Sequence, residues 1–340
     1  MKTVKVAAIQ PESVYGENEY QNALNAPKYL EEAARTGAQL ICFPEGYPGP
    51  AHGPLDSKGM LDRTPIEILC EAVRKLGIAY VAASNVELVE GKEDLYYLCQ
   101  KLIDPKGRII GDHRRVQPDE PDLNEYLFNG KRDFAPGNEC VVCDTEIGKV
   151  GLLICSELFV PELVRIETLM GAEIIVAPVN GLHEESLLES VNPPQWDTWK
   201  CISRCRAAEN MIYVIVTQNL FVKSYRGVGH IAGPEKMLVE FDRPGVFTAE
   251  LDMERLQWLR DTSYSWEVLK PPKGKPPVEL PIGTRPGQHI LRRPEVYQKL
   301  VEPLPSDWDY FYYQKEPKIR RARHQRGDRL VAGLQKGERK

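Results

Sequence analysis

The chain has 340 residues, of which 42% are hydrophobic and 27% are charged, and its formal net charge is −5. This length suits one large domain or two ordinary ones, and the apolar fraction is enough for a sizeable core. No stretch approaches the ~18 consecutive apolar residues of a membrane-spanning helix, and the N-terminus lacks the apolar segment of an export signal, so we expect a cytoplasmic protein with no membrane partner.

In the first half, short apolar runs rich in β-branched residues alternate with helical patterns. A helix is predicted over 18–36, where apolar residues recur every three or four positions. A second helix is predicted from TPIE to Gly77, because Thr64 can cap it and Pro65 suits its first position. The predicted strands are 4–10, 39–46, 78–87 and 95–104, the last two joined by a hairpin turn.

The second half continues this alternation, with near-continuous apolar runs at 149–155, 172–178 and 211–219. Such runs are typical of strands covered on both faces. The predicted helices are 161–170 and 195–210, and short strands follow at 229–234, 238–241 and 247–252. This order of elements predicts an α/β layered fold, and no Gly-rich phosphate-binding loop is present.

The character of the chain changes after Arg260. Residues 270–290 are rich in proline and glycine and are predicted to form an extended arm. Residues 315–340 hold ten Lys or Arg and three acids, which leaves about −12 on the rest of the chain. We favour a solvated end or a subunit-docking segment over a nucleic-acid partner, because aromatic residues are not interleaved with the basic ones beyond the start of this tail.

Eight cysteines are present, most of them inside apolar runs. Without an export signal, buried free thiols are expected rather than disulfides. The spacings CVVC (140–143) and CISRC (201–205) lack a nearby histidine, so we expect no metal site at either pair.

Cys155 ends the apolar run GLLIC, and Pro161 opens the next helix. A side chain at this point stands at the carboxyl edge of a sheet, where α/β folds place their sites. A backbone N–H just after the cysteine could serve as an oxyanion donor. Buried cysteines are also among the commonest core residues, so the position alone leaves both interpretations open.

Charged residues at two further points could take part in the same chemistry. Glu45 ends another apolar run, in CFPEG, and is either a solvated loop residue or a pocketed base for a thiol. Arg114 and Arg115 lie in the segment 111–130 with several carboxylates. They belong either to a surface charge run or to a cationic site beside the thiol.

Together these stretches resemble the carbon–nitrogen hydrolase family, also called the nitrilase superfamily, over roughly residues 4–300. VAAIQP resembles its first strand, FPEG its glutamate motif and GLLICSELFVPELVR its cysteine motif. RCRAAENMIYVIVTQN, GHIAGP, TAELDMERL and RRPEVYQKL resemble its later portions. The number of matches in the right order and spacing makes the resemblance specific.

The resemblance implies a four-layer α-β-β-α sandwich that pairs into homodimers or larger homo-oligomers and needs no metal or organic cofactor. It also implies a cysteine that attacks an amide or nitrile carbon, and a thioester that water then hydrolyses. Glu45 would be the general base, Cys155 the nucleophile and Glu125, in NEYLFNG, a supporting glutamate. We expect a hydrolase of a small amide or N-carbamoyl compound, with a small nitrile as the alternative substrate.

Two departures from the family pattern stand out. The family usually has Arg-Lys where this chain has HRRVQP, so Arg115 occupies the lysine position. An arginine can donate hydrogen bonds to an oxyanion, but it cannot pass a proton to a leaving amine. Either the pocket is rebuilt around the guanidinium, which we favour, or Lys131 reaches in, or turnover is impaired and the chain is a catalytically silent binding or scaffold protein. Ser156 is the second departure, where many amidases have a bulky aromatic residue.

Three lesser expectations complete the prediction. His52 is expected at the surface rather than in a pocket wall, and Glu209 is expected to bond a buried arginine such as Arg206. The domain is expected to span residues 1–262. Residues 263–340 are expected to form a C-terminal extension that packs on a neighbouring subunit, as such extensions do in relatives of similar length.

Overall fold

The computed structural model describes residues 3–93, 95–118, 133–181, 194–221, 227–261, 273 and 292–302. The chain divides into two units, Met1–Pro286 and Gly287–Lys340. Both sheets of the fold lie in the first unit, and the second has the short 3₁₀ helices Pro294–Val296 and Gln298–Leu300 among its described residues. The tail 315–340, and all of the arm 270–290 except residue 273, lie outside the described residues. The expected boundary after residue 262 therefore stays a prediction.

The first sheet has seven strands in the order β13-β1-β2-β3-β4-β5, and β6 also pairs with β4. Strands β1, β2 and β3 are parallel, and β13 runs antiparallel to β1. Strand β4 runs antiparallel to β3 and β5 but parallel to β6. The bounds are β1 Thr3–Gln10, β2 Leu40–Cys42, β3 Tyr80–Leu88, β4 Leu95–Ile103, β5 Ile109–Arg114, β6 Asp133–Phe134 and β13 Gly245–Asp252.

The second sheet has six strands in the order β12-β11-β10-β9-β8-β7. Its three central strands, β8, β9 and β10, are parallel, so their carboxyl ends lie along one edge of the sheet. The bounds are β7 Val141–Thr145, β8 Gly148–Leu152, β9 Ile174–Val176, β10 Tyr213–Val216, β11 His230–Ala232 and β12 Met237–Glu240.

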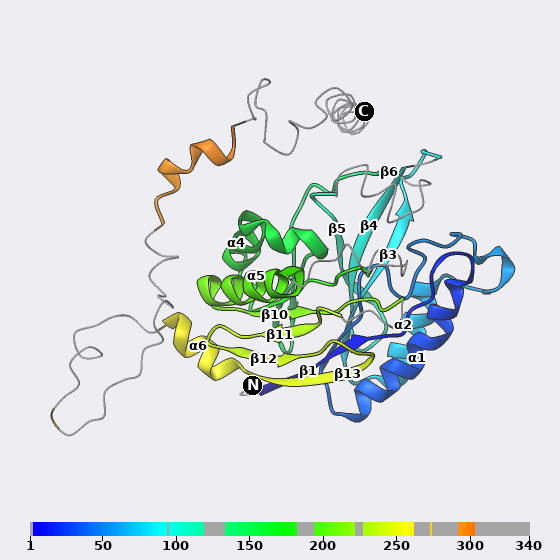
Figure 1. Cartoon of the computed structure of the whole chain (residues 1–340), viewed down its shortest axis with the longest axis horizontal. Coiled ribbons are helices and arrows are strands. Elements are labelled where there is room, and N and C mark those ends of the chain that lie inside the picture. Colours follow the sequence, from blue (N-terminus) through cyan, green and yellow to red (C-terminus); the bar gives the residue numbers. More distant parts are fainter. Residues whose placement is uncertain are drawn as a thin grey trace. The chain divides into compact units, whose positions relative to one another are not determined.

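Helices cover the outer faces of the two sheets (Figure 1). Among the described residues these are α1 Tyr20–Arg35, α2 Pro65–Leu76, α4 Pro161–Leu169 and α5 Pro194–Asn210. Helix α6, Met253–Asp261, instead buries Met253, Leu256 and Leu259 in the core between the sheets. The sequence signals for α2 are confirmed, because Thr64 and Glu67 form a capping box and Gly77 ends the helix with a φ of 67°. None of the helices in the described ranges is long and apolar enough to cross a membrane.

Three apolar layers hold these elements together. The inner faces of the two sheets pack on each other through residues such as Val6 and Leu102 of the first sheet and Val150 and Ile215 of the second. A second cluster joins α1 and α2 to the first sheet, and a third joins α4 and α5 to the second sheet. The predicted α-β-β-α sandwich is confirmed.

The strand predicted at 39–46 is shorter than expected, and its early end creates a turn. Phe43 still donates its N–H to the carbonyl of Ala82, at 2.9 Å. Pro44 has no N–H to continue the ladder, and Gly46 has a φ of 66°, which suits glycine. The chain therefore leaves the sheet at Pro44 and Gly46, on either side of Glu45.

Candidate active site

Glu45 is held at this turn by residues that follow two strands of the other sheet. Its side chain accepts a hydrogen bond from the backbone N–H of Asn180, at 2.7 Å from Oε2. Its own carbonyl accepts one from the Asn219 side chain, at 2.6 Å. Only 1% of Glu45 is exposed. The interpretation of this residue as a solvated loop glutamate is therefore wrong, and it is a buried carboxyl between the two sheets.

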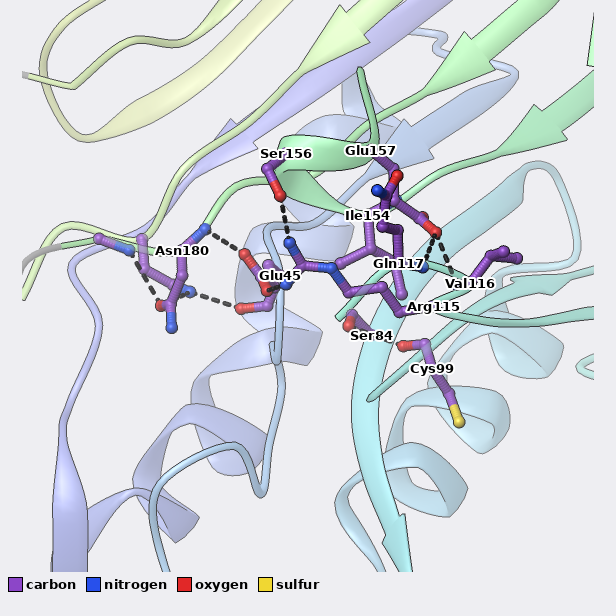
Figure 2. A network of polar contacts seen from close by, with 12 residues as sticks. Glu45, Ser84, Cys99, Arg115, Val116, Gln117, Ile154, Ser156, Glu157 and Asn180 are labelled. Carbon is purple, nitrogen blue, oxygen red and sulfur yellow. Dashed lines mark hydrogen bonds and ion pairs between the residues drawn. The ribbon is translucent and has the colours of Figure 1, made fainter. Parts of the chain in front are cut away.

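Arg115 reaches the same place from the end of β5. Side chains alternate along this strand, so that His113 and Arg115 are buried while Arg114 is exposed and lies over the Tyr97 ring, 4.2 Å from its centroid. The Arg115 guanidinium forks between two partners (Figure 2). Nη1 lies 3.5 Å from Glu45 Oε1, and Nη2 donates to Ser156 Oγ. The structure thus brings together Glu45, Arg115 and the residue that follows Cys155.

Cys155 begins the 3₁₀ helix η3, Cys155–Phe159, just after β8 ends. Its φ is 53°, in the left-handed region that a residue with a side chain seldom occupies and that costs about 1–3 kcal/mol. Its N–H donates to the carbonyl of Pro178, at 2.8 Å, which anchors the turn to the second residue after β9. Strained backbone of this kind is common at functional sites. It was not predicted, because a dihedral angle depends on tertiary contacts.

A polar network lies behind Glu45. The Asn180 side chain accepts from Asn219 Nδ2 at 3.2 Å, and its own Nδ2 lies 3.1 Å from His52 Nε2. The His52 side chain is only 1% exposed, so the expectation of a surface histidine is wrong. The prediction also missed both asparagines. Their signal was a polar side chain within four residues of the end of an apolar strand, the same signal that pointed to Glu45.

Some predicted site residues are not tested by the structure. Glu125 and Lys131 lie outside the described residues. Glu209 accepts from Arg206 at 2.8 Å, as expected of a structural glutamate.

The other cysteines differ from Cys155 in their surroundings. All eight thiols are free, but Cys201 and Cys205 are exposed, so the expectation of burial is wrong for this pair. Burial raises the pKa of Cys140 and Cys143 to about 11, and it also raises the pKa of Cys42 and Cys99. These four thiols stay protonated at neutral pH and are poor nucleophiles. Within the described ranges, no cluster of three or more His, Cys, Asp or Glu side chains could hold a metal ion.

The sequence pattern of one protein family, described as carbon-nitrogen hydrolase, matches residues 5–261. The chain belongs to the carbon–nitrogen hydrolase family. Nitrilase homolog 2 of Dictyostelium discoideum is 29% identical over 216 residues, and the match covers 63% of this chain and 62% of that protein. Omega-amidase NIT3 of Saccharomyces cerevisiae is 26% identical, and the match covers 76% of this chain and 90% of that protein.

Solved structures of the nitrilase superfamily share the fold of this carbon–nitrogen hydrolase. Saccharomyces cerevisiae Nit3 superposes with a TM-score of 0.60 at 21% identity, over 76% of this chain and 93% of that one. The amidase from Nesterenkonia AN1 superposes with a TM-score of 0.58 at 20% identity, over 75% of this chain and 93% of its mutant structure. The resemblance drawn from the motifs is thereby confirmed.

Proposed function

We propose that this carbon–nitrogen hydrolase is an amidase that cleaves a small amide or N-carbamoyl compound through a thioester on Cys155. The observation that carries the proposal is the contact of one guanidinium with both the Glu45 carboxyl and the residue after Cys155. The choice of an amide over a nitrile is supported by the relatives, several of which are named omega-amidases.

The reaction would begin with transfer of the Cys155 thiol proton to the Glu45 carboxylate while the sulfur attacks the carbonyl carbon. The carbonyl oxygen becomes an oxyanion, which Arg115 and the backbone N–H of Ser156 stabilise. The C–N bond then breaks, and Glu45 returns the proton to the leaving ammonia. Since a guanidinium does not deprotonate, Glu45 alone carries this proton.

The second half of the cycle repeats the same steps with water. Glu45 takes a proton from a water molecule whose oxygen attacks the thioester carbon, and Arg115 again stabilises the oxyanion. The C–S bond breaks, the carboxylic acid leaves, and the proton on Glu45 returns to the thiolate. Atoms and charges balance over the cycle, and the net reaction is an amide plus water giving an acid plus ammonia.

Ammonia release from a mixed panel of small amides, N-carbamoyl compounds and nitriles tests this proposal. We expect the wild-type protein to release ammonia from an amide or N-carbamoyl member of the panel. Cys155→Ala should abolish the release while keeping the wild-type melting temperature within a few degrees. Release only from nitriles would contradict the choice of substrate, and full activity in Cys155→Ala would contradict the mechanism.

A catalytically silent binding protein is the second candidate, and the arginine in the usual lysine position favours it. It predicts that no member of the panel releases ammonia. It also predicts that iodoacetamide labels Cys155 no faster than the exposed Cys201, because nothing would then favour the Cys155 thiolate.

A further inference from the structure

Glu157 lies two residues after Cys155, within η3, and is completely buried. Its two carboxyl oxygens accept four hydrogen bonds. Oε2 accepts from the N–H of Ile154 at 2.8 Å and lies 2.8 Å from His113 Nε2, and Oε1 accepts from the N–H of Val116 at 2.6 Å and of Gln117 at 3.3 Å. A carboxylate only accepts, so His113 carries its proton on Nε2.

These four partners come from the two chain segments that carry the proposed chemistry. Ile154 directly precedes Cys155, while His113 and Val116 lie on either side of Arg115 in the chain. Figure 2 shows the bonds from Val116 and Gln117 to Glu157, with Ile154, the third backbone donor, beside it. One buried side chain therefore ties the turn of the cysteine to the strand end of the arginine.

We infer that Glu157 is a positioning residue that sets the distance between Cys155 and Arg115, an inference that rests on the proposed function. Both strands end here, so the N–H groups of Ile154 and Val116 have left their ladders and need an acceptor. A glutamine at 157 has the same shape but only one oxygen. Its NH₂ group would face N–H donors that it cannot satisfy, and the two segments would move apart.

The effect on catalysis follows from this geometry. Misplacing a catalytic group by about 1 Å costs on the order of 100-fold in rate. A shift between the segments would move Arg115 relative to the oxyanion that forms on the substrate carried by Cys155. Substitution of Glu157 should therefore lower kcat, and this decrease should be seen only when residue 115 is an arginine.

The test compares Glu157→Gln in two backgrounds, the wild type and Arg115→Met. We expect Glu157→Gln to lower kcat by about 100-fold in the wild-type background, with KM changed by less than about threefold. In the Arg115→Met background the same substitution should lower kcat by less than about threefold. Glu167→Gln is the matched control, because it makes the same change at another completely buried carboxyl, and its kcat should stay within about twofold of wild type.

Alkylation of Cys155 by iodoacetamide gives a second readout that needs no substrate. If Glu157 holds the guanidinium near the thiol, Glu157→Gln should slow alkylation at pH 7 by about tenfold and shift its pH midpoint upward. A merely structural role would change the melting temperature without changing this pH profile.

Several outcomes would overturn the inference. An equal loss of kcat in both backgrounds would show that Glu157 does not act through Arg115, and an unchanged kcat would show that it does not position anything. If Glu157→Gln does not fold, His113→Leu removes one of the four donors instead, and its loss should likewise depend on Arg115. A wild type with no turnover and an unreactive Cys155 would overturn the proposed function itself, whereas a reactive wild type with additive losses would overturn this inference alone.

Discussion

Arg115 contacts Glu45 and Ser156 through two separate nitrogens of its fork, whereas a lysine would have to reach both residues with a single nitrogen. Arg115→Lys should therefore lower kcat by roughly 10- to 100-fold, as one ammonium loses at least one of these partners. Steady-state kinetics on the best substrate of the panel measure this loss. Arg114→Lys is the matched control, since that side chain lies on the other face of β5.

The direction of this change separates two accounts of the arginine. If the pocket is rebuilt around the guanidinium, restoring the family's lysine harms the enzyme. If the arginine instead disables the site, Arg115→Lys should create activity where the wild type has none, and that result would contradict the proposed function.

The sequence predicted each proposed catalytic residue individually, but it did not predict the residues that surround them. Glu45, Arg115 and Cys155 each follow a strand, which the apolar runs and the family motifs indicate. The burial of His52 and the four bonds of Glu157 depend on segments far apart in the sequence. Sequence patterns carry little information on such long-range contacts, so the supporting residues emerged only from the structure.

At the scale of the elements, Glu167 of α4 faces the second sheet as a buried carboxyl. Burial, and secondarily the charge of Glu157, raise the pKa of Glu167 well above its usual range. The folded state then binds this proton more tightly than the unfolded state, so the free energy of unfolding falls as the pH rises above about 4.5. Glu167→Gln should flatten this dependence between pH 5 and pH 8.

Urea denaturation of the wild type and Glu167→Gln at both pH values checks this prediction. The difference in unfolding free energy should move in favour of the variant by at least about 1 kcal/mol from pH 5 to pH 8, which corresponds to one pKa unit. Parallel pH profiles for the two proteins would contradict it.

His230 of β11 predicts a loss of stability in acid. Burial lowers its pKa to about 4, and its ring lies between Ser203 Oγ, 2.7 Å from Nε2, and the carbonyl of Val228, 2.6 Å from Nδ1. Between about pH 6.5 and 4 the unfolded chain takes up a proton that the folded chain does not. The free energy of unfolding should fall by roughly 3 kcal/mol over this range.

His230→Gln keeps a donor and an acceptor at this position but does not titrate. Thermal or urea unfolding at pH 6.5 and at pH 4 should show that the variant loses about 3 kcal/mol less stability than the wild type between these two values. Equal losses in the two proteins would mean that other groups dominate the response to acid.

Local sequence signals predicted the ends of an element well where the same residues form the hydrogen bonds or backbone turn that end it. Thr64, Glu67 and Gly77 set the ends of α2 through their own hydrogen bonds and dihedral angle. The strand predicted at 39–46 is too long because the prediction extended it past Pro44. Periodicity alone does not show that the ladder stops, whereas the missing N–H of Pro44 does.

At the scale of the whole molecule, the packing of the two sheets brings the ends of β2, β5 and β8 together. Composition and periodicity predicted an α/β fold, but two separate sheets packed face to face were an expectation from the family resemblance only. Local sequence patterns do not indicate which strands share a sheet, because strand pairing depends on contacts between residues far apart in the sequence.

The resemblance also predicts an assembly of at least two copies, with the C-terminal extension packed on a neighbouring subunit. Light scattering of the full chain should give a molar mass at least twice that of the monomer. A chain that ends at Asp261, the last residue of α6, should form a smaller assembly. An unchanged number of subunits in the shortened chain would contradict the docking role of the extension.

The most direct test of the central claim is to locate the covalent intermediate. The wild-type protein is quenched in acid during turnover of its best amide, digested, and analysed by mass spectrometry. The account predicts an acyl group on the peptide that contains Cys155, and its absence from the Cys155→Ala protein. Turnover without an acyl group on Cys155, or with the acyl group on another residue such as the exposed Cys201, would contradict it.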